Sequence, residues 1–221
     1  MAKSFPNTGA TVGLAADRSA LASPFAGMQF FETDTKALYL YNGSAWVSML
    51  DTDTPPGIVK LTSGSLSGTT TNIVSCFSSV FTNYRLIVNN VRFAGGAADL
   101  YFRMLNSTTP FTSGQYYWAY RGLRSDGVSL DSSGGGQTLN YMGITNTVSG
   151  VDGNGSYDIF SPFLTNTTYA TGIGTGLTSG TGYNMRSGMM AVDNTSSYDG
   201  IQLLTNTAPT FTGSYTLYGY N

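Results

Sequence analysis

The feature that most constrains the fold of this chain is the regular return of turn-forming residues between short apolar segments. After residue 60, clusters of Gly, Asn, Asp and Ser interrupt the chain at roughly the 8–12-residue spacing of a β-sandwich, and no segment has helical periodicity. The segments that read as strands are 73–81, 84–93, 98–105, 115–124, 137–145, 156–164, 167–173, 183–192, 200–204 and 213–220. Many short strands without crossover helices predict an all-β chain with an antiparallel β-sandwich, jelly-roll-like in topology.

The composition supports an all-β fold. Charged residues make up 10% of the 221 residues, against roughly 25% in an ordinary soluble domain. Gly occurs 28 times and Tyr 15 times, whereas the helix former Glu occurs once, at Glu32. With so few charges, solubility must come from hydroxyl and amide groups, which suits a protein held in a large assembly.

The first 50 residues form a separate small unit in this interpretation. A short helix is predicted within 13–23, and a three-stranded meander follows over 28–49, with a tight turn at 32–35 and an Asn42-Gly43 hairpin turn. Its apolar side chains exceed what so small a unit can bury, which predicts docking against another surface; they are Phe30, Leu38, Leu40, Trp46 and Val47. We therefore expect a meander over 1–50, a flexible linker over 51–71 and a sandwich over 72–221.

Several function classes lack the residues they need. The chain has no His and a single cysteine, Cys76, which we expect to be a small buried hydrophobe, so we predict no cofactor, no zinc site and no Ser-His or Cys-His nucleophile. A net charge of −2 and a pI of about 4.8 offer no basic field for nucleic acid. No apolar run approaches a membrane span, and the N-terminal residues lack the apolar stretch of a signal peptide, so we expect neither membrane insertion nor signal-peptide export.

Two carboxylates are candidates for catalytic acids. Asp99 and Asp158 are the acids within apolar, strand-like surroundings, and a glycosidase needs two carboxylates across a cleft. Nothing else in the sequence ties them together, so we predict no enzyme and keep a polysaccharide depolymerase as a minor alternative. The segment from Asp152 to Asp158 places oxygen ligands at alternate positions, as a calcium loop does, but lacks the closing Glu, and a Gly-rich hairpin turn is favoured there.

An aromatic run over 115–121 has strand alternation. Tyr116, Trp118 and Tyr120 share one face, which we expect to point into the sandwich. On the other face, Tyr117 and Arg121 are candidates for binding glycans, since an aromatic ring offers a rigid apolar face with a polar rim.

One segment resembles a known family. FAGMQFFETDTKALYLYNGSAWV, residues 25–47, resembles the G-x-x-F-x-E-T-D-T-x-x-L-Y-x-Y-N-G-x-x-W hairpin of tailed-bacteriophage virion proteins. Residues 84–121 and the C-terminal stretch 211–220 are similar to β-sandwich domains of the same class. The hairpin is typical of phage virions without specifying one virion role.

The resemblance implies a homotrimeric structural protein located in the virion. It implies that Phe30, Tyr39, Tyr41 and Trp46 of the meander attach the protein to other virion proteins, and that the sandwich faces outward. Two roles stay open: a short tail fibre or receptor-binding appendage contacting host surface polysaccharide, and a capsid decoration or head-fibre protein. In the first role, specificity would lie in the loops 131–136, 150–156 and 178–182.

Overall fold

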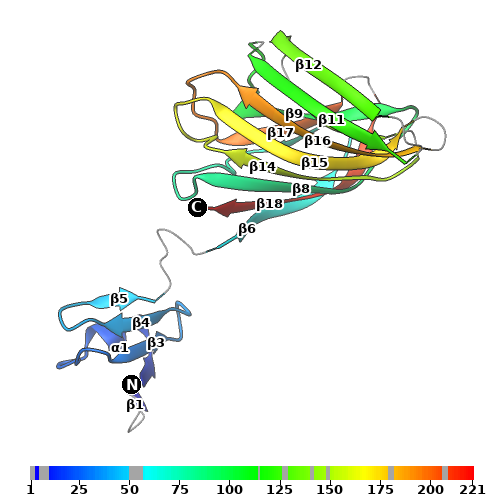
Figure 1. Cartoon of the computed structure of the whole chain (residues 1–221). Coiled ribbons are helices and arrows are strands. Elements are labelled where there is room, and N and C mark those ends of the chain that lie inside the picture. Colours follow the sequence, from blue (N-terminus) through cyan, green and yellow to red (C-terminus); the bar gives the residue numbers. More distant parts are fainter. Residues whose placement is uncertain are drawn as a thin grey trace. The chain divides into compact units, whose positions relative to one another are not determined.

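The chain folds into two compact units, Met1–Pro56 and Gly57–Asn221, in a computed structural model (Figure 1). The structure describes residues 3–4, 10–49, 57–113, 115–125, 129–139, 142–147, 150–178, 182–205 and 209–221. Strands account for 59% of the chain and helix for 3%, which confirms the predicted all-β class. No helix in the described part of the chain has the length and apolar character that a membrane crossing requires.

The N-terminal unit is one five-stranded sheet with a short helix. Its elements are β1 (Lys3–Ser4), β2 (Ala10–Gly13), α1 (Ala15–Ser19), β3 (Gln29–Glu32), β4 (Leu38–Tyr41) and β5 (Trp46–Ser48), with the strands in sequence order across the sheet. The predicted meander is confirmed in β3, β4 and β5. Strands β1 and β2, which are very short, were not predicted from the sequence; β2 pairs parallel with β3 after the crossover through α1.

The second unit consists of two antiparallel sheets. The larger has eight strands in the order β12-β11-β16-β15-β14-β8-β18-β6, and the smaller has the order β10-β9-β17-β7 with β13 also paired to β9. The strands are β6 (Val59–Leu66), β7 (Thr70–Ile73), β8 (Asn83–Phe93), β9 (Ala98–Asn106), β10 (Thr109–Pro110), β11 (Tyr116–Arg124), β12 (Ser129–Leu139), β13 (Met142–Thr147), β14 (Gly153–Phe160), β15 (Thr168–Thr178), β16 (Gly182–Val192), β17 (Gly200–Thr205) and β18 (Phe211–Tyr220).

The core of this unit lies between the two sheets, whose inward-facing side chains pack against each other. Strand β8 shows how alternation builds it: Tyr84, Leu86 and Val88 are buried, and the buried series resumes one position out of phase at Val91. Asn90, with φ 52°, lies where the pairing of β8 with β14 and β18 shifts register. A β-bulge there accounts for the change of phase. The predicted antiparallel sandwich is thus present, whereas its jelly-roll topology stays a prediction.

The prediction of a flexible linker over 51–71 is wrong over 59–66 and 70–71, which are strand, and residues 51–56 of it lie outside the described residues. Residues 59–66 form β6, the edge strand beside β18, and 70–73 form β7. Their Ser, Thr and Gly residues resemble a linker in composition, but an exposed edge strand needs only a few apolar anchors, of which Leu66 is one.

Two further element predictions are corrected. The strand expected over 73–81 is absent beyond Ile73: Ser75 has φ 50°, and the amides of Cys76 and Phe77 both donate to the carbonyl of Asp199, which turns the chain. The Gly-rich tract 131–136, expected to be a loop, lies within β12, where it pairs with β11. Backbone pairing along β11 holds this tract extended, although its composition is that of a turn.

Candidate functional site

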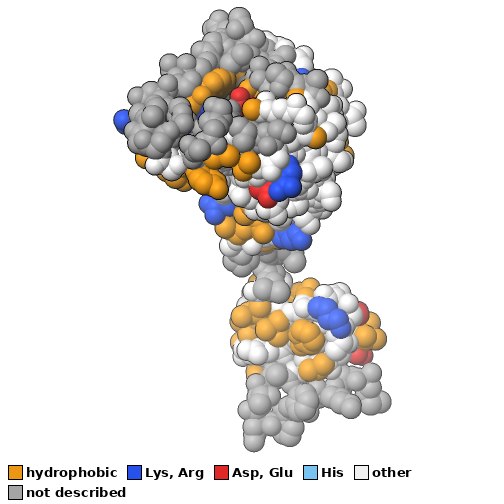
Figure 2. Space-filling model, turned by 90° about the vertical axis from the view of Figure 1, so that its right-hand side faces the viewer, with side chains coloured by type: hydrophobic (Ala, Val, Ile, Leu, Met, Phe, Trp, Pro, Cys, Tyr) orange, Lys and Arg blue, Asp and Glu red, His pale blue; other side chains and the backbone are white. Residues whose placement is uncertain are grey.

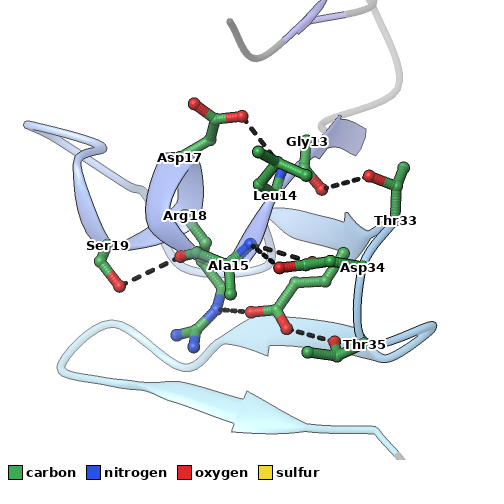
Figure 3. Close-up of polar contacts among 10 residues, drawn as sticks. Gly13, Leu14, Ala15, Asp17, Arg18, Ser19, Thr33, Asp34 and Thr35 are labelled. Carbon is green, nitrogen blue, oxygen red and sulfur yellow. Dashed lines mark hydrogen bonds and ion pairs between the residues drawn. The ribbon is translucent and has the colours of Figure 1, made fainter.

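The E-T-D-T motif of the N-terminal unit builds a polar network inside that unit (Figure 3). Glu32 is 1% exposed, and one carboxylate oxygen accepts a hydrogen bond from Arg18 Nε at 2.6 Å, while the other accepts one from the Thr35 hydroxyl. The Arg18 guanidinium also lies 4.1 Å from the centre of the Tyr39 ring. A buried carboxylate is tolerable here because it is paired and hydrogen-bonded.

The other two residues of the motif hold the segment that enters α1. Both the amide and the hydroxyl of Thr33 donate to the carbonyl of Gly13, at 2.8 Å and 3.2 Å. The carboxylate of Asp34 accepts from the amide of Ala15 at 3.1 Å, and so satisfies one of the free N–H groups at the start of the helix (Figure 3). The motif therefore has a structural role within the unit.

The virion-attachment residues expected from the sequence lie on one face of this sheet. Phe30 is 0% exposed and contacts Trp46 edge to face at 5.9 Å, and Tyr41 lies 5.3 Å from the same indole. Tyr39, Tyr41 and Trp46 are half-buried. Phe30 is therefore corrected: its side chain is enclosed within the unit and cannot reach a partner. This face is the interior of the unit, because Arg18 of α1 packs over it.

The opposite face of the same sheet is apolar and open, and Figure 2 shows hydrophobic side chains at the surface of this unit. Register pairs Phe31 with Leu38, and Leu40 with Val47, so these four side chains lie together on it. Phe31 is 37% exposed and Val47 48%. We call these four residues the open face. Leu38, Leu40 and Val47 were predicted from the sequence to be surplus apolar residues, whereas Phe31 was not. The signal for Phe31 was the two-residue alternation, which places it on the face opposite to Phe30.

In the sandwich, Asp99 lies in a small cavity between the sheets. Its carboxylate accepts from Arg186 Nη1 at 3.1 Å and from the Tyr101 hydroxyl at 3.0 Å. Trp118 and Tyr120 line the same cavity, stacked in parallel with ring centres 5.2 Å apart, which confirms the predicted inward orientation of the Trp118 face. The cavity volume is about 40 Å³, room for a few water molecules and less than a sugar ring needs.

Asp158 lies on the outer face of the larger sheet. Arg85 Nε and Nη2 donate to its two oxygens at 2.8 Å and 2.9 Å, and the Tyr220 hydroxyl donates to it at 3.0 Å. These bonds, that of Arg85 first, lower the pKa of the Asp158 carboxyl. Burial, and then the hydrogen bond to Asp158, raise the pKa of Tyr220 to about 12.

The two candidate catalytic acids do not face each other. Asp99 belongs to β9 of the smaller sheet and points into the cavity, whereas Asp158 follows the inward-facing Tyr157 on β14 and points outward. A glycosidase acid also needs a raised pKa, and that of Asp158 is lowered. The arrangement provides no pair of carboxylates across one cleft.

The possible calcium segment is also accounted for by other contacts. Asp152 pairs with Arg92 at 2.8 Å, the Asn154 side chain accepts from the amide of Asn90 at 3.0 Å, and Asp158 is held by Arg85. Among the described residues no group of three potential metal ligands comes together. The hairpin turn predicted over this segment is wrong, because residues 153–160 form the central strand β14.

The two glycan-binding candidates lie on the outer face of the larger sheet. Tyr117 is half-buried and Arg121 is exposed, and the two residues lie four positions apart on β11. Of the three predicted specificity loops, 131–136 is strand, as noted above. Residues 150–152 form a loop before β14 begins, and 178–182 join β15 to β16, with 179–181 outside the described residues.

Cys76 is half-buried, and its thiol donates to the carbonyl of Ile73 at 3.3 Å. Burial raises the pKa of this thiol to about 12, so it is not a reactive nucleophile at neutral pH.

No protein-family model matches the chain, and no curated protein is significantly similar to it.

Proposed function

We propose that this chain is a structural protein of a tailed-bacteriophage virion. Its N-terminal unit attaches to other virion proteins and its sandwich faces outward, as a homotrimeric short tail fibre or receptor-binding appendage. It contacts host surface glycans and catalyses no reaction. The resemblance of residues 25–47 to virion hairpins supports this assignment.

The single observation that carries the proposal is the open face of the N-terminal unit. On one side of the five-stranded sheet, Phe31 and Val47 are partly exposed, and together with Leu38 and Leu40 they form an apolar surface that is open to a partner. The other side is covered by α1 and by the Glu32–Arg18 ion pair, which pack against the sheet and stabilise it. The open face therefore replaces the Phe30 side of the sheet as the attachment surface.

The absence of catalysis is inferred from the setting of the acids. Asp99 and Asp158 are each neutralised by an arginine, on different faces of the sandwich. If the chain were instead a polysaccharide depolymerase, purified protein would shorten host polysaccharide, and Asp99→Asn or Asp158→Asn would abolish that turnover.

Attachment through the open face is tested by incorporation into particles. Val47→Asp places a charge on this face, at a position 48% exposed, and we expect it to abolish incorporation while the protein still folds. Leu14→Asp is the matched control, since Leu14 is 51% exposed and is the N-cap residue of α1, outside the four residues of the open face. Equal incorporation of both variants would refute attachment through this face.

The capsid decoration or head-fibre role is the second candidate. It is favoured by the length of chain between the units: β5 ends at Ser48 and β6 begins at Val59, so ten residues of sequence, 49–58, separate them, too few for a long fibre shaft. Images of particles labelled with an antibody against the sandwich separate the two roles. Label on the tail in a few tens of copies supports the appendage, whereas label on the head in hundreds of copies supports decoration.

A further inference from the structure

The outer face of the larger sheet carries a row of exposed apolar side chains on three neighbouring strands, β11, β16 and β15. Six large side chains on it are between 42% and 68% exposed; they are Leu123, Tyr169, Ile173, Tyr183, Met185 and Met189. We call this set the apolar sheet face. Its members are neighbours across the strands. Leu123 on β11 pairs with Met185 on β16. Ile173 on β15 is the diagonal neighbour of Met189 on β16, because Met189 pairs with Thr171, two residues before Ile173.

The exposed apolar area is large for a free surface. Side chains of this size each present about 200 Å² when fully exposed, so six that are half exposed present on the order of 600 Å². This equals the largest patch expected on a monomer and is most of the roughly 800 Å² that each partner buries in a standard interface. Small residues on the same face, such as Ala119 and Thr171, lie beside these side chains and do not project above them, so a flat partner can contact the whole area.

The charge on this face favours a copy of the same chain as the partner. Among the described outward positions of the three strands, Arg121 is the single charged side chain, and no carboxylate is present. Two such faces meet with little like-charge repulsion, and neither presents a charge pattern that would select a charged partner. Tyr and Met, which supply four of the six side chains, are enriched at protein interfaces.

A glycan does not account for the whole of this face. The glycan candidates Tyr117 and Arg121 also lie on it, and Tyr117 shares the row of Ala191 with Tyr169, but a sugar bound there would leave Tyr183, Met185 and Leu123 uncovered. Sugar binding needs neighbouring aromatic rings with polar groups at their edges. Tyr169 and Tyr183 lie on adjacent strands but eight residues apart in register, since Tyr169 pairs with Ala191, which is about 26 Å along the sheet. Met189, Ile173 and Met185 lie between them.

We propose that the apolar sheet face is the contact between copies of this chain. The proposal deepens the homotrimer of the proposed function by naming the surface that forms it. In a threefold arrangement, the β15 side of one face, with Ile173, packs against the β11 side of the next, with Leu123. Met185 and Met189, on the central strand β16, fill the irregular space between them.

The test is the oligomeric state of the full chain in solution. Sedimentation equilibrium is measured for the wild type, for the Ile173→Glu/Met189→Glu variant, and for Ser187→Lys, which adds a second positive charge opposite Arg121 without removing an apolar side chain. All three positions are exposed, so the variants should fold, as checked by circular dichroism. We expect an oligomeric wild type and, in the variants, a dissociation constant at least about 100-fold higher.

Val74→Glu is the matched control: Val74 is 45% exposed but follows β7, in the other sheet, and should leave the association unchanged. A wild type that is monomeric would refute both the contact and the trimer. An oligomer that survives the face variants would refute the contact alone and leave the proposed function standing. A dimer that the face variants dissociate would support the contact while contradicting the threefold assembly.

Discussion

Glu32, the chain's one glutamate, shows what a single buried charge can hold together. Glu32→Ala leaves the Arg18 guanidinium unpaired beside the buried Phe30 layer, so we expect the free energy of unfolding of the N-terminal unit to fall by about 3 kcal/mol. Glu32→Gln keeps an acceptor for Arg18 and should cost about 1 kcal/mol.

Trp46 reports on this unit and Trp118 on the sandwich, and the chain has 2 tryptophans. Urea unfolding followed by Trp46 fluorescence, in a Trp118→Phe background, therefore measures the effect of both Glu32 substitutions. Equal midpoints for Glu32→Ala and its parent protein would show that the network contributes no stability.

The ion pair of Asp158 with Arg85 should make the free energy of unfolding of the sandwich depend on pH. Because the hydrogen bonds from Arg85 lower the pKa of Asp158 in the folded state, its contribution to stability is complete above the ordinary carboxyl pKa of about 4 and is lost as the pH falls through the lowered value. Asp158→Asn should therefore be less stable than wild type at pH 7, by about 1 kcal/mol for a partly exposed pair. The two proteins should converge in stability once the pH is below the lowered pKa of Asp158.

Chemical denaturation of both proteins between pH 7 and pH 2.5 measures this difference. A gap between them that stays constant across the range would mean that Asp158 contributes through packing instead of charge.

At the scale of elements, β15 shows why a strand can need glycine. A Cβ at Gly172 would overlap the ring of the buried Tyr157 on β14 and lie 2.6 Å from the carbonyl oxygen of Ser156. Gly172→Ala should therefore destabilise the sandwich by about 1–3 kcal/mol, because strand and ring must move apart. Gly96→Ala is the control, since a Cβ there has no atom within 4 Å. Thermal unfolding of both variants measures the difference, and equal losses would contradict this account.

Elements differ in how far their sequence reveals them. Strands such as β8 follow from alternating apolar residues, whereas β12 has the glycines of a turn and becomes a strand through its pairing with β11. Composition describes what a segment can do alone, and a sheet edge supplies hydrogen-bond partners that composition does not record.

At the scale of the whole molecule, the two units should be separable. Among the described residues, the buried sandwich core begins at Leu66, with Val59 and Leu61 packed against it, and all of its members belong to the unit Gly57–Asn221. A chain that begins at Gly57 should therefore unfold with the same midpoint as the sandwich in the full chain, while losing incorporation into particles. Calorimetry of both chains tests the first statement, and a sandwich transition that disappears on truncation would refute it.

Alternation and turn chemistry are local properties, so the all-β class, the meander over β3, β4 and β5, and the inward orientation of Trp118 could be predicted from the residues alone. Which side of each strand is covered depends on packing between elements. A two-residue period defines two faces, but only the packing of α1 encloses Phe30 and leaves Phe31 and Val47 outside. The same holds for Asp99 and Asp158: strand pairing places them on different faces, and no local pattern in the chain encodes that separation.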